Sequence, residues 1–254
     1  VPDRWLVTLA AKILQVDPLE VEQVFQQLLK DNLLRTEDVG DHVCVYPEYL
    51  YRAEEGAARR LLALRDNVNA LWKVDYQKII REWERDERIQ LAPEQAEAVK
   101  ASVDHGVFVL TGGPGTGKTT VIKGILSVME QAGCKILLAA PTGRAAKRLA
   151  ESAGKPALTV HRLLEYTPNG EGDSFWGRDE DNPLEADAVI VDEASMMDIV
   201  LMYNLLKALP LGCRLILVGD VDQLPSVGPG SVLQDIIRSG TMPIVRLENV
   251  FRQA

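Results

Sequence analysis

Short runs of apolar residues alternate with amphipathic stretches over residues 91–254. The apolar runs predict buried β-strands at residues 107–111, 135–140, 188–191, 214–218 and 244–247. The stretches between them predict helices near residues 93–102, 118–131, 143–152, 198–209 and 232–238. Apolar strands separated by helices are typical of a parallel sheet with helices on both faces. The pattern therefore predicts an α/β fold, in which ligands bind at the carboxyl ends of the strands.

Residues 1–90 show a different pattern. Apolar spacing and turn residues predict two helices and then two short strands, at residues 5–14, 17–29, 33–36 and 43–46. This order predicts a smaller, mainly helical, winged-helix-like unit over residues 1–50, followed by a charge-rich helical connector over residues 51–90. Some winged-helix units bind DNA, but the acidic turn between the two strands favours a packing or partner role at least as much.

An acidic interruption occupies residues 171–187. It contains seven Asp or Glu residues and one basic residue, Arg178, and we expect a solvated loop or hairpin with Phe175 and Trp176 as its bulky anchors. Such a segment can line a DNA path, although its acidic balance favours a plain surface insertion.

Composition narrows the class of protein. Apolar residues make up 46% of the 254 residues and charged residues 26%, as in ordinary globular proteins. The sequence shows no signal peptide and no apolar run long enough to cross a membrane, so we expect a cytoplasmic location. The three cysteines are far apart and indicate reduced thiols. The net charge of −9 argues against indiscriminate nucleic-acid binding but allows a local basic strip.

The clearest chemical motif is the stretch Gly-Gly-Pro-Gly-Thr-Gly-Lys-Thr at residues 112–119, between an expected strand and an expected helix. Glycines let successive backbone N–H groups cradle phosphate oxygens, and the start of the helix adds partial positive charge. Lys118 would reach the β- and γ-phosphates, and the Thr119 hydroxyl would bind Mg²⁺. A glycine-rich turn that matches by chance is the alternative, which the strand and helix disfavour. The predicted nucleotide-binding residues here are Gly113, Pro114, Gly115, Thr116, Gly117, Lys118, Thr119 and Thr120.

Two further strands are expected to end in polar residues. The strand at residues 188–191 is followed by Asp192 and Glu193, where Asp192 would hold Mg²⁺ and Glu193 would deprotonate the attacking water. The strand at residues 214–218 leads into a turn with Gln223, which can sense a γ-phosphate or the attacking water. Taken alone, the second turn is equally well explained as an ordinary turn stabilised by Asp and Gly.

Together these motifs resemble the RecD-like superfamily 1 DNA helicases, the family of the exodeoxyribonuclease V alpha subunit. The resemblance is dense over residues 91–254 and looser before them. It implies a RecA-like P-loop NTPase domain, the first of two motor domains. The matching stretches are residues 112–119, 138–149, 192–195, 219–227 and 249–254.

The resemblance also implies roles for single residues. Gln95 is similar to the family's adenine-contacting glutamine, and Arg252 to the arginine that contacts the γ-phosphate during hydrolysis. Five residues resemble single-stranded DNA contacts: Pro141, Thr142, Gly143, Arg144 and His161. The basic balance of residues 141–164 agrees with a groove that follows a phosphate backbone. A structural histidine, hydrogen-bonded at a helix start, is an equally good interpretation of His161.

The function implied is an ATP-dependent DNA helicase or translocase, using ATP and Mg²⁺, moving 5′ to 3′ on single-stranded DNA in repair and recombination. We find no second RecA-like half in this chain, so we expect it to hold the nucleotide-binding half and to hydrolyse ATP poorly by itself. Its partners would be single-stranded DNA and, in some assemblies, subunits of a nuclease–helicase complex. Two alternatives remain open: a P-loop ATPase that does not unwind DNA, such as a clamp or regulatory module, and an interaction module with a vestigial ATP site.

Overall fold

The computed structural model describes residues 1–67, 75–168, 174–223 and 225–251. Contacts along the chain divide it into two compact units, Val1–Gly56 and Ala57–Ala254. Within the described ranges no helix is long and apolar enough to cross a membrane.

The first unit contains two helices and a hairpin, as its pattern predicted. Asp17 starts α2 because its side chain accepts a hydrogen bond from Leu19 N at 2.8 Å, and Pro18 occupies the first turn. Strands β1 and β2 pair antiparallel around a turn in which Gly40 has a φ of +60°. The elements of this unit are α1 (Asp3–Leu14), α2 (Pro18–Lys30), β1 (Leu34–Val39), β2 (His42–Pro47) and the beginning of α3 (Glu48–Asp66).

The apolar spacing of α1 does not correspond to a buried face. Trp5 is 72% exposed, and Leu9 and Ile13 on the same side of the helix are also exposed. Ala11 and Phe25 are the residues that α1 and α2 bury. Helical spacing therefore predicted the helix correctly, whereas burial depends on what packs against it.

The second unit is built on one six-stranded parallel sheet in the described residues. The strand order is β10-β3-β9-β8-β4-β5, which confirms the predicted α/β fold. The sequence pattern missed β5, because three residues are too few to form a recognisable apolar run. The strands are β3 (Val107–Gly112), β4 (Ile136–Ala140), β5 (Ala157–Thr159), β8 (Ala188–Val191), β9 (Arg214–Gly219) and β10 (Ile244–Leu247).

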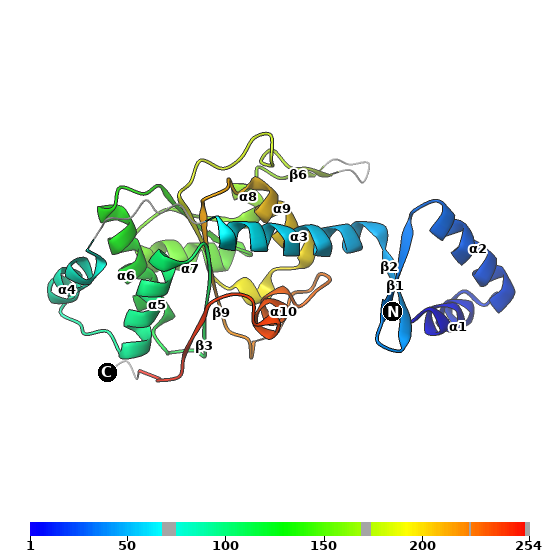
Figure 1. Ribbon diagram of the computed structural model, residues 1–254, viewed down its shortest axis with the longest axis horizontal. Coiled ribbons are helices and arrows are strands. Elements are labelled where there is room, and N and C mark those ends of the chain that lie inside the picture. Colours follow the sequence, from blue (N-terminus) through cyan, green and yellow to red (C-terminus); the bar gives the residue numbers. More distant parts are fainter. Residues whose placement is uncertain (68–74, 169–173, 224, 252–254) are drawn as a thin grey trace. The chain divides into compact units, whose positions relative to one another are not determined.

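Helices cover both faces of this sheet (Figure 1). Alternate residues of β3 point to opposite sides, so that Phe108 and Leu110 belong to one hydrophobic cluster and Val107 and Val109 to the other. The first cluster is completed by α4 (Tyr76–Glu87), α5 (Pro93–Asp104), α6 (Lys118–Gln131) and α7 (Gly143–Ala153). The second is completed by the later turns of α3 and by α8 (Val160–Leu163), α9 (Ile199–Ala208) and α10 (Val232–Ser239).

The acidic interruption contains β7 (Ser174–Phe175), which pairs antiparallel with β6 (Thr167–Pro168), a strand that precedes the interruption. The prediction that Phe175 anchors it is wrong, since this side chain is 61% exposed. Trp176 does pack against the core, and Leu184, which the sequence did not single out, is buried in it. Because acidic residues surround Leu184 in the sequence, its burial could not be predicted from local composition.

Candidate functional site

Three of the predicted catalytic residues, Lys118, Glu193 and Gln223, lie along one edge of the sheet. All six strands are parallel, so their carboxyl ends meet there. The register sets Thr111 of β3 opposite Gly219 of β9, and Leu217 of β9 opposite Val191 of β8. The glycine-rich loop, the Gln223 turn and the Asp192–Glu193 pair therefore follow three neighbouring strands.

The glycine-rich loop has the backbone that its sequence predicted. Gly115 and Gly117 have φ values of +78° and +87°, a region that L-residues rarely adopt. A Cβ on Gly117 would lie 2.3 Å from Gln95 Nε2, so a larger residue would displace the Gln95 side chain as well as strain the backbone. Helix α6 starts at Lys118, and its free N–H groups point toward the loop. The loop is thus a preformed cradle for an anion.

Lys118 holds its ammonium group over this cradle. Its Nζ donates hydrogen bonds to Gly112 O at 2.6 Å and to Gly113 O at 2.9 Å. The Thr116 hydroxyl also donates to Gly113 O, at 2.9 Å, and keeps the loop closed. An ammonium group has three donors, so Lys118 can hold a phosphate oxygen while it remains at the loop. Thr119, in the first turn of α6, is exposed.

A pocket of about 450 Å³ opens beside the loop, and Gln95 lies in its wall. Gln95 is buried and fastens two segments: its Oε1 accepts from Ala92 N at 3.0 Å, and its Nε2 donates to Thr116 O at 3.3 Å. The sequence singled out Gln95 but missed three residues that share the wall, Ile89, Gln90 and Phe251.

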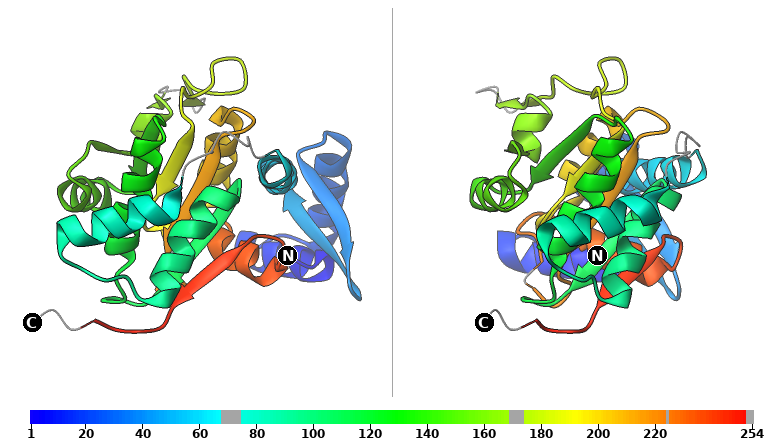
Figure 2. Two further views of the ribbon diagram at one scale, coloured as in Figure 1. Left: turned by 60° about the vertical axis from the view of Figure 1, so that its left-hand side comes forward. Right: turned by 90° about the vertical axis from the view of Figure 1, so that its left-hand side faces the viewer.

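The segment after β10 lies against the same loop. Phe251 N donates to Gly115 O at 2.9 Å, and Asn249 Nδ2 donates to Glu94 Oε1, at the start of α5, at 3.0 Å. Figure 2 shows this segment in red, continuing from β10 at the edge of the sheet beside α5. Phe251 directly precedes Arg252, which lies outside the described residues, so the role predicted for Arg252 stays a prediction.

The acidic pair after β8 is held in an unusual backbone. Asp192 Oδ1 accepts a hydrogen bond from Glu193 N at 2.9 Å, and Glu193 has a left-handed φ of 54°, which is strained for a residue other than glycine. Burial raises the pKa of the Asp192 carboxyl, while the bond from Glu193 N and the positive charge of Lys118 act against that rise. The positive charge of Lys118 therefore favours the ionised form of the Asp192 carboxyl.

The residues present fit a magnesium ion bound together with a phosphate. The Thr119 hydroxyl and the Asp192 carboxylate are oxygen ligands of the kind that Mg²⁺ prefers. Among the described residues no group of three or more His, Cys, Asp and Glu side chains could hold a metal. Phosphate oxygens and water would have to complete the coordination, as is usual for Mg²⁺ at nucleotide sites.

Gln223 lies in the turn after β9, beside a buried carboxylate. Its Nε2 is 3.4 Å from Asp220 Oδ2, at the long limit of a hydrogen bond, and Asp220 is only 3% exposed. Asp222 N donates to the other oxygen, Oδ1, at 3.0 Å. The Gln223 amide is therefore weakly held and can exchange its partner.

The predicted DNA contacts follow the next two strands of the sheet, β4 and β5. Thr142 caps α7 by accepting from Ala145 N at 3.3 Å, next to exposed Gly143 and Arg144 and half-buried Pro141. On α8, His161 is exposed and stacks on Trp176, with ring centroids 5.8 Å apart. The contacts described for its ring are aromatic, with Trp176 and Tyr166. The contacts described for the ring do not include the hydrogen bond expected of a structural histidine at a helix start.

Comparison with known proteins agrees with this arrangement. Residues 95–229, more than half of the chain, match the model of the AAA domain. The chain belongs to the AAA domain family. The chain is also similar to the ATP-dependent RecD2 DNA helicase of Deinococcus radiodurans, at 45% identity over 164 residues. It is 35% identical to the RecBCD enzyme subunit RecD of Mycobacterium tuberculosis over an alignment of 259 residues, gaps included. These likenesses confirm the predicted resemblance to RecD-like helicases.

The alignments differ in extent. The first covers 65% of this chain and 22% of the relative, and the second 93% and 40%. The chain thus spans less than half the length of either relative. The solved structure of Pif1 helicase from Candida albicans aligns with 65% of this chain and 41% of that chain, at 24% identity and a TM-score of 0.48. The fold assignment rests on the strand order rather than on this likeness.

Proposed function

We propose that this chain is the nucleotide-binding half of an ATP-dependent DNA helicase motor that moves on single-stranded DNA. The observation that carries the proposal is the order of strand ends along one sheet edge. Four neighbouring strands, β10, β3, β9 and β8, lead into residues suited to ATP, and the next two, β4 and β5, lead into residues suited to DNA. ATP and DNA would then bind to one rigid element, as coupling between them requires.

The triphosphate would lie in the glycine-rich loop. The N–H groups of the loop and of α6, together with Lys118, offer donors to the β- and γ-phosphates. The base would enter the pocket beside the loop, where Phe251 and Ile89 offer apolar contact and Gln90 and Gln95 offer amide groups. Contacts with the base in this pocket would make the chain bind nucleotides more tightly than inorganic phosphate.

Hydrolysis would use the neighbouring strand ends. Thr119 and Asp192 would hold Mg²⁺, which when bound would neutralise charge that develops on the phosphates. Glu193 is half-buried at the same edge and would accept a proton from the attacking water. Gln223 would leave Asp220 and donate from Nε2 to the γ-phosphate. Arg252, by its resemblance, would stabilise the transition state.

Single-stranded DNA would pass the beginning of α7. The free N–H groups of its first turn and the exposed Arg144 suit a phosphate group, and Lys147 and Arg148 extend the positive charge along the helix. His161, on the next strand end, offers an exposed ring to a base.

A second motor domain would supply the opposite wall of the ATP site. We therefore expect this chain to bind ATP and Mg²⁺ weakly and to hydrolyse ATP slowly. The named relatives include a RecBCD enzyme subunit, and subunits of a nuclease–helicase complex are accordingly proposed as partners, with a cytoplasmic location. A non-unwinding ATPase is supported by no specific observation.

Fluorescence anisotropy of a labelled oligothymidine tests the proposal. We expect binding that depends on salt, is weakened about threefold to tenfold by Arg144→Ala, and changes when a non-hydrolysable ATP analogue is added. Arg238→Ala, at an exposed position of α10, is the matched control and should have no effect. DNA affinity that is unchanged both by Arg144→Ala and by the nucleotide would contradict the proposal and favour an ATPase of another kind.

A further inference from the structure

The turn that follows β8 contains a buried hydroxyl group without a partner. Among the residues that the structure describes, only Thr111 Oγ1 and Ser195 Oγ are buried side-chain oxygen or nitrogen atoms with no hydrogen bond. Leaving such a group unpaired costs free energy, so an unpaired hydroxyl in a catalytic turn requires an explanation.

The backbone around Ser195 is fixed. Glu193 and Ala194 accept hydrogen bonds from Met196 N at 3.0 Å and Met197 N at 3.1 Å, which close the short helix η1 (Ala194–Met196). A Cβ on Gly219, at the end of β9, would lie 2.6 Å from Leu233 Cδ2 and 3.1 Å from Ser195 N, so this turn packs closely against β9. The Ser195 hydroxyl can change its rotamer while the backbone of the turn stays beside β9.

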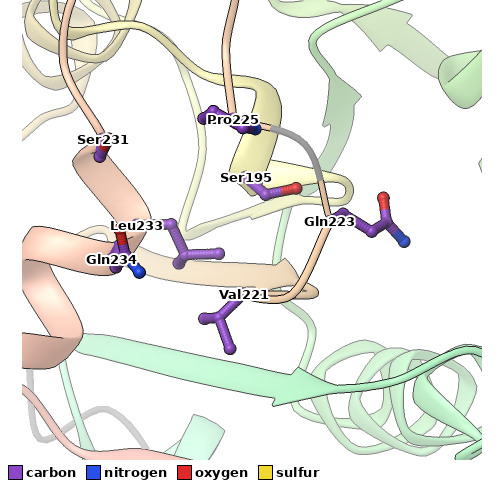
Figure 3. A pocket seen from close by; sticks show the side chains of 7 residues that line it. All are labelled: Ser195, Val221, Gln223, Pro225, Ser231, Leu233 and Gln234. Carbon is purple, nitrogen blue, oxygen red and sulfur yellow. The ribbon is translucent and has the colours of Figure 1, made fainter.

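Ser195 and the turn that carries Gln223 line one cavity of about 160 Å³. Figure 3 shows the Ser195 oxygen directed toward this turn, while the Gln223 amide is turned away from the cavity. The cavity is large enough for the Gln223 side chain to swing into it. Its lining residues are Ser195, Val221, Gln223, Pro225, Ser231, Leu233 and Gln234.

The Gln223 amide has two chemically different ends. Only Nε2 can donate to a phosphate oxygen, whereas Oε1 would repel it, so a γ-phosphate sensor must have its amide in one orientation. In the present structure the amide is held by the 3.4 Å contact of Nε2 with Asp220 Oδ2. When Nε2 leaves Asp220, a donor is needed to hold Oε1.

We infer that Ser195 is a positioning residue that supplies this donor. When a triphosphate is bound, the Ser195 hydroxyl donates to Gln223 Oε1 and thereby directs Nε2 toward the γ-phosphate. The inference rests on the proposed ATP site. It links the turn after β8 to the turn after β9 and explains why both line one cavity.

The test compares Ser195→Ala with the unaltered chain in titrations with ADP and with a non-hydrolysable ATP analogue, both with Mg²⁺. We expect the analogue to bind about fivefold more weakly, the effect of one hydrogen bond, and ADP affinity to be unchanged. The melting temperature of the nucleotide-free variant should stay the same or rise, because an unpaired buried hydroxyl is removed. Ser231→Ala, which lines the cavity from the α10 side, is the control and should change neither affinity.

A double variant tests the route through Gln223. Ser195→Ala combined with Gln223→Ala should bind the analogue no more weakly than Gln223→Ala alone, since the two changes remove one interaction. Ser195→Cys, a weaker donor of similar size, should give an intermediate affinity.

Three outcomes would overturn the inference: equal losses for ADP and the analogue, a lowered melting temperature, or an additive loss in the double variant. If the unaltered chain prefers the analogue over ADP and Ser195→Ala keeps that preference, this inference fails while the proposed ATP site stands. If the unaltered chain binds neither nucleotide, the proposed function fails as well.

Discussion

The hydrogen bonding of polar groups differs between the amino and carboxyl edges of the six-stranded sheet. At the amino edge, the buried Arg214 guanidinium donates to Val103 O from Nε at 3.2 Å and from Nη2 at 3.0 Å. Asp187 at the same edge accepts from Lys135 N at 2.8 Å. At the carboxyl edge, within the described residues, Thr111 and Ser195 keep unpaired hydroxyls. Glu193 there has a strained backbone. The polar groups named at the amino edge are hydrogen-bonded, whereas the two hydroxyls at the carboxyl edge can still bond to a ligand.

This contrast predicts that substitutions at the amino edge change stability and those at the carboxyl edge change binding. Arg214→Ala should give the largest effect, a loss of about 3 kcal/mol in the free energy of unfolding, because the buried Val103 carbonyl loses its donors. Urea denaturation measures it, with exposed Arg238→Ala as the control, expected within about 0.5 kcal/mol of the unaltered chain. An Arg214→Ala variant of normal stability but weakened nucleotide affinity would reverse the assignment of the two edges.

Lys118→Ala should show the opposite behaviour. We expect ATP affinity in the presence of Mg²⁺ to fall about 100-fold, because the phosphates lose a charge-assisted hydrogen bond. The free energy of unfolding should change by no more than about 1 kcal/mol. Isothermal titration measures the affinity, and Lys123→Ala, at an exposed position of the same helix, is the matched control. Equal affinities for both variants would refute the phosphate contact.

Phe251→Ala should lower the affinities for ADP and for ATP equally, by about tenfold, because we expect the ring to pack against the base rather than the phosphates. Phe251→Tyr keeps a ring in the pocket and should restore most of the affinity. Phe175→Ala removes another exposed phenylalanine, distant along the chain, and serves as the control. A selective loss of ATP affinity would place Phe251 at the phosphates instead.

Asp192→Asn should have the smallest effect on the free energy of unfolding of the nucleotide-free chain, and should raise it. Burial raises the pKa of Asp192 in the folded state, so folding is disfavoured as the pH rises from the unfolded pKa through the folded one. Asn removes this penalty and still accepts from Glu193 N. Urea denaturation should therefore show the variant more stable at neutral pH, with the difference vanishing below about pH 4. The ATP affinity of this variant should no longer rise with Mg²⁺. A variant less stable than the unaltered chain at neutral pH would contradict the penalty assigned to the buried Asp192 carboxylate.

Much of the second unit could be predicted from the sequence, because fully buried strands must be apolar along their whole length. The glycine-rich loop was equally predictable, since its φ values at Gly115 and Gly117 allow few other residues. Strand order was not, because local pattern carries no information on which strands become neighbours. The strand β5 was missed because three residues form no recognisable apolar run, and the exposure of α1 was missed because burial depends on what packs against the helix.

The candidate site was predicted where a motif runs in sequence and missed where folding assembles it. Asp192 and Gln223 follow strands and were found from that context. Ile89 and Phe251 line the pocket because distant segments meet there. No local signal marks Ile89, and Phe251 lies in a recognised stretch that did not indicate its place in the pocket. Ser195 stood within a recognised motif, but its unpaired hydroxyl is a property of tertiary packing.

The central claim is that the carboxyl edge of the sheet binds ATP and Mg²⁺. The most direct test is a titration of the ¹⁵N-labelled chain with ATP and Mg²⁺, followed by backbone amide chemical shifts. We expect saturable shifts in Gly113, in residues 115–120, in Asp192 and in Gln223, and none at Val103 or Arg214 on the amino edge. Shifts that fail to saturate, or that spare residues 113–120, would contradict the claim.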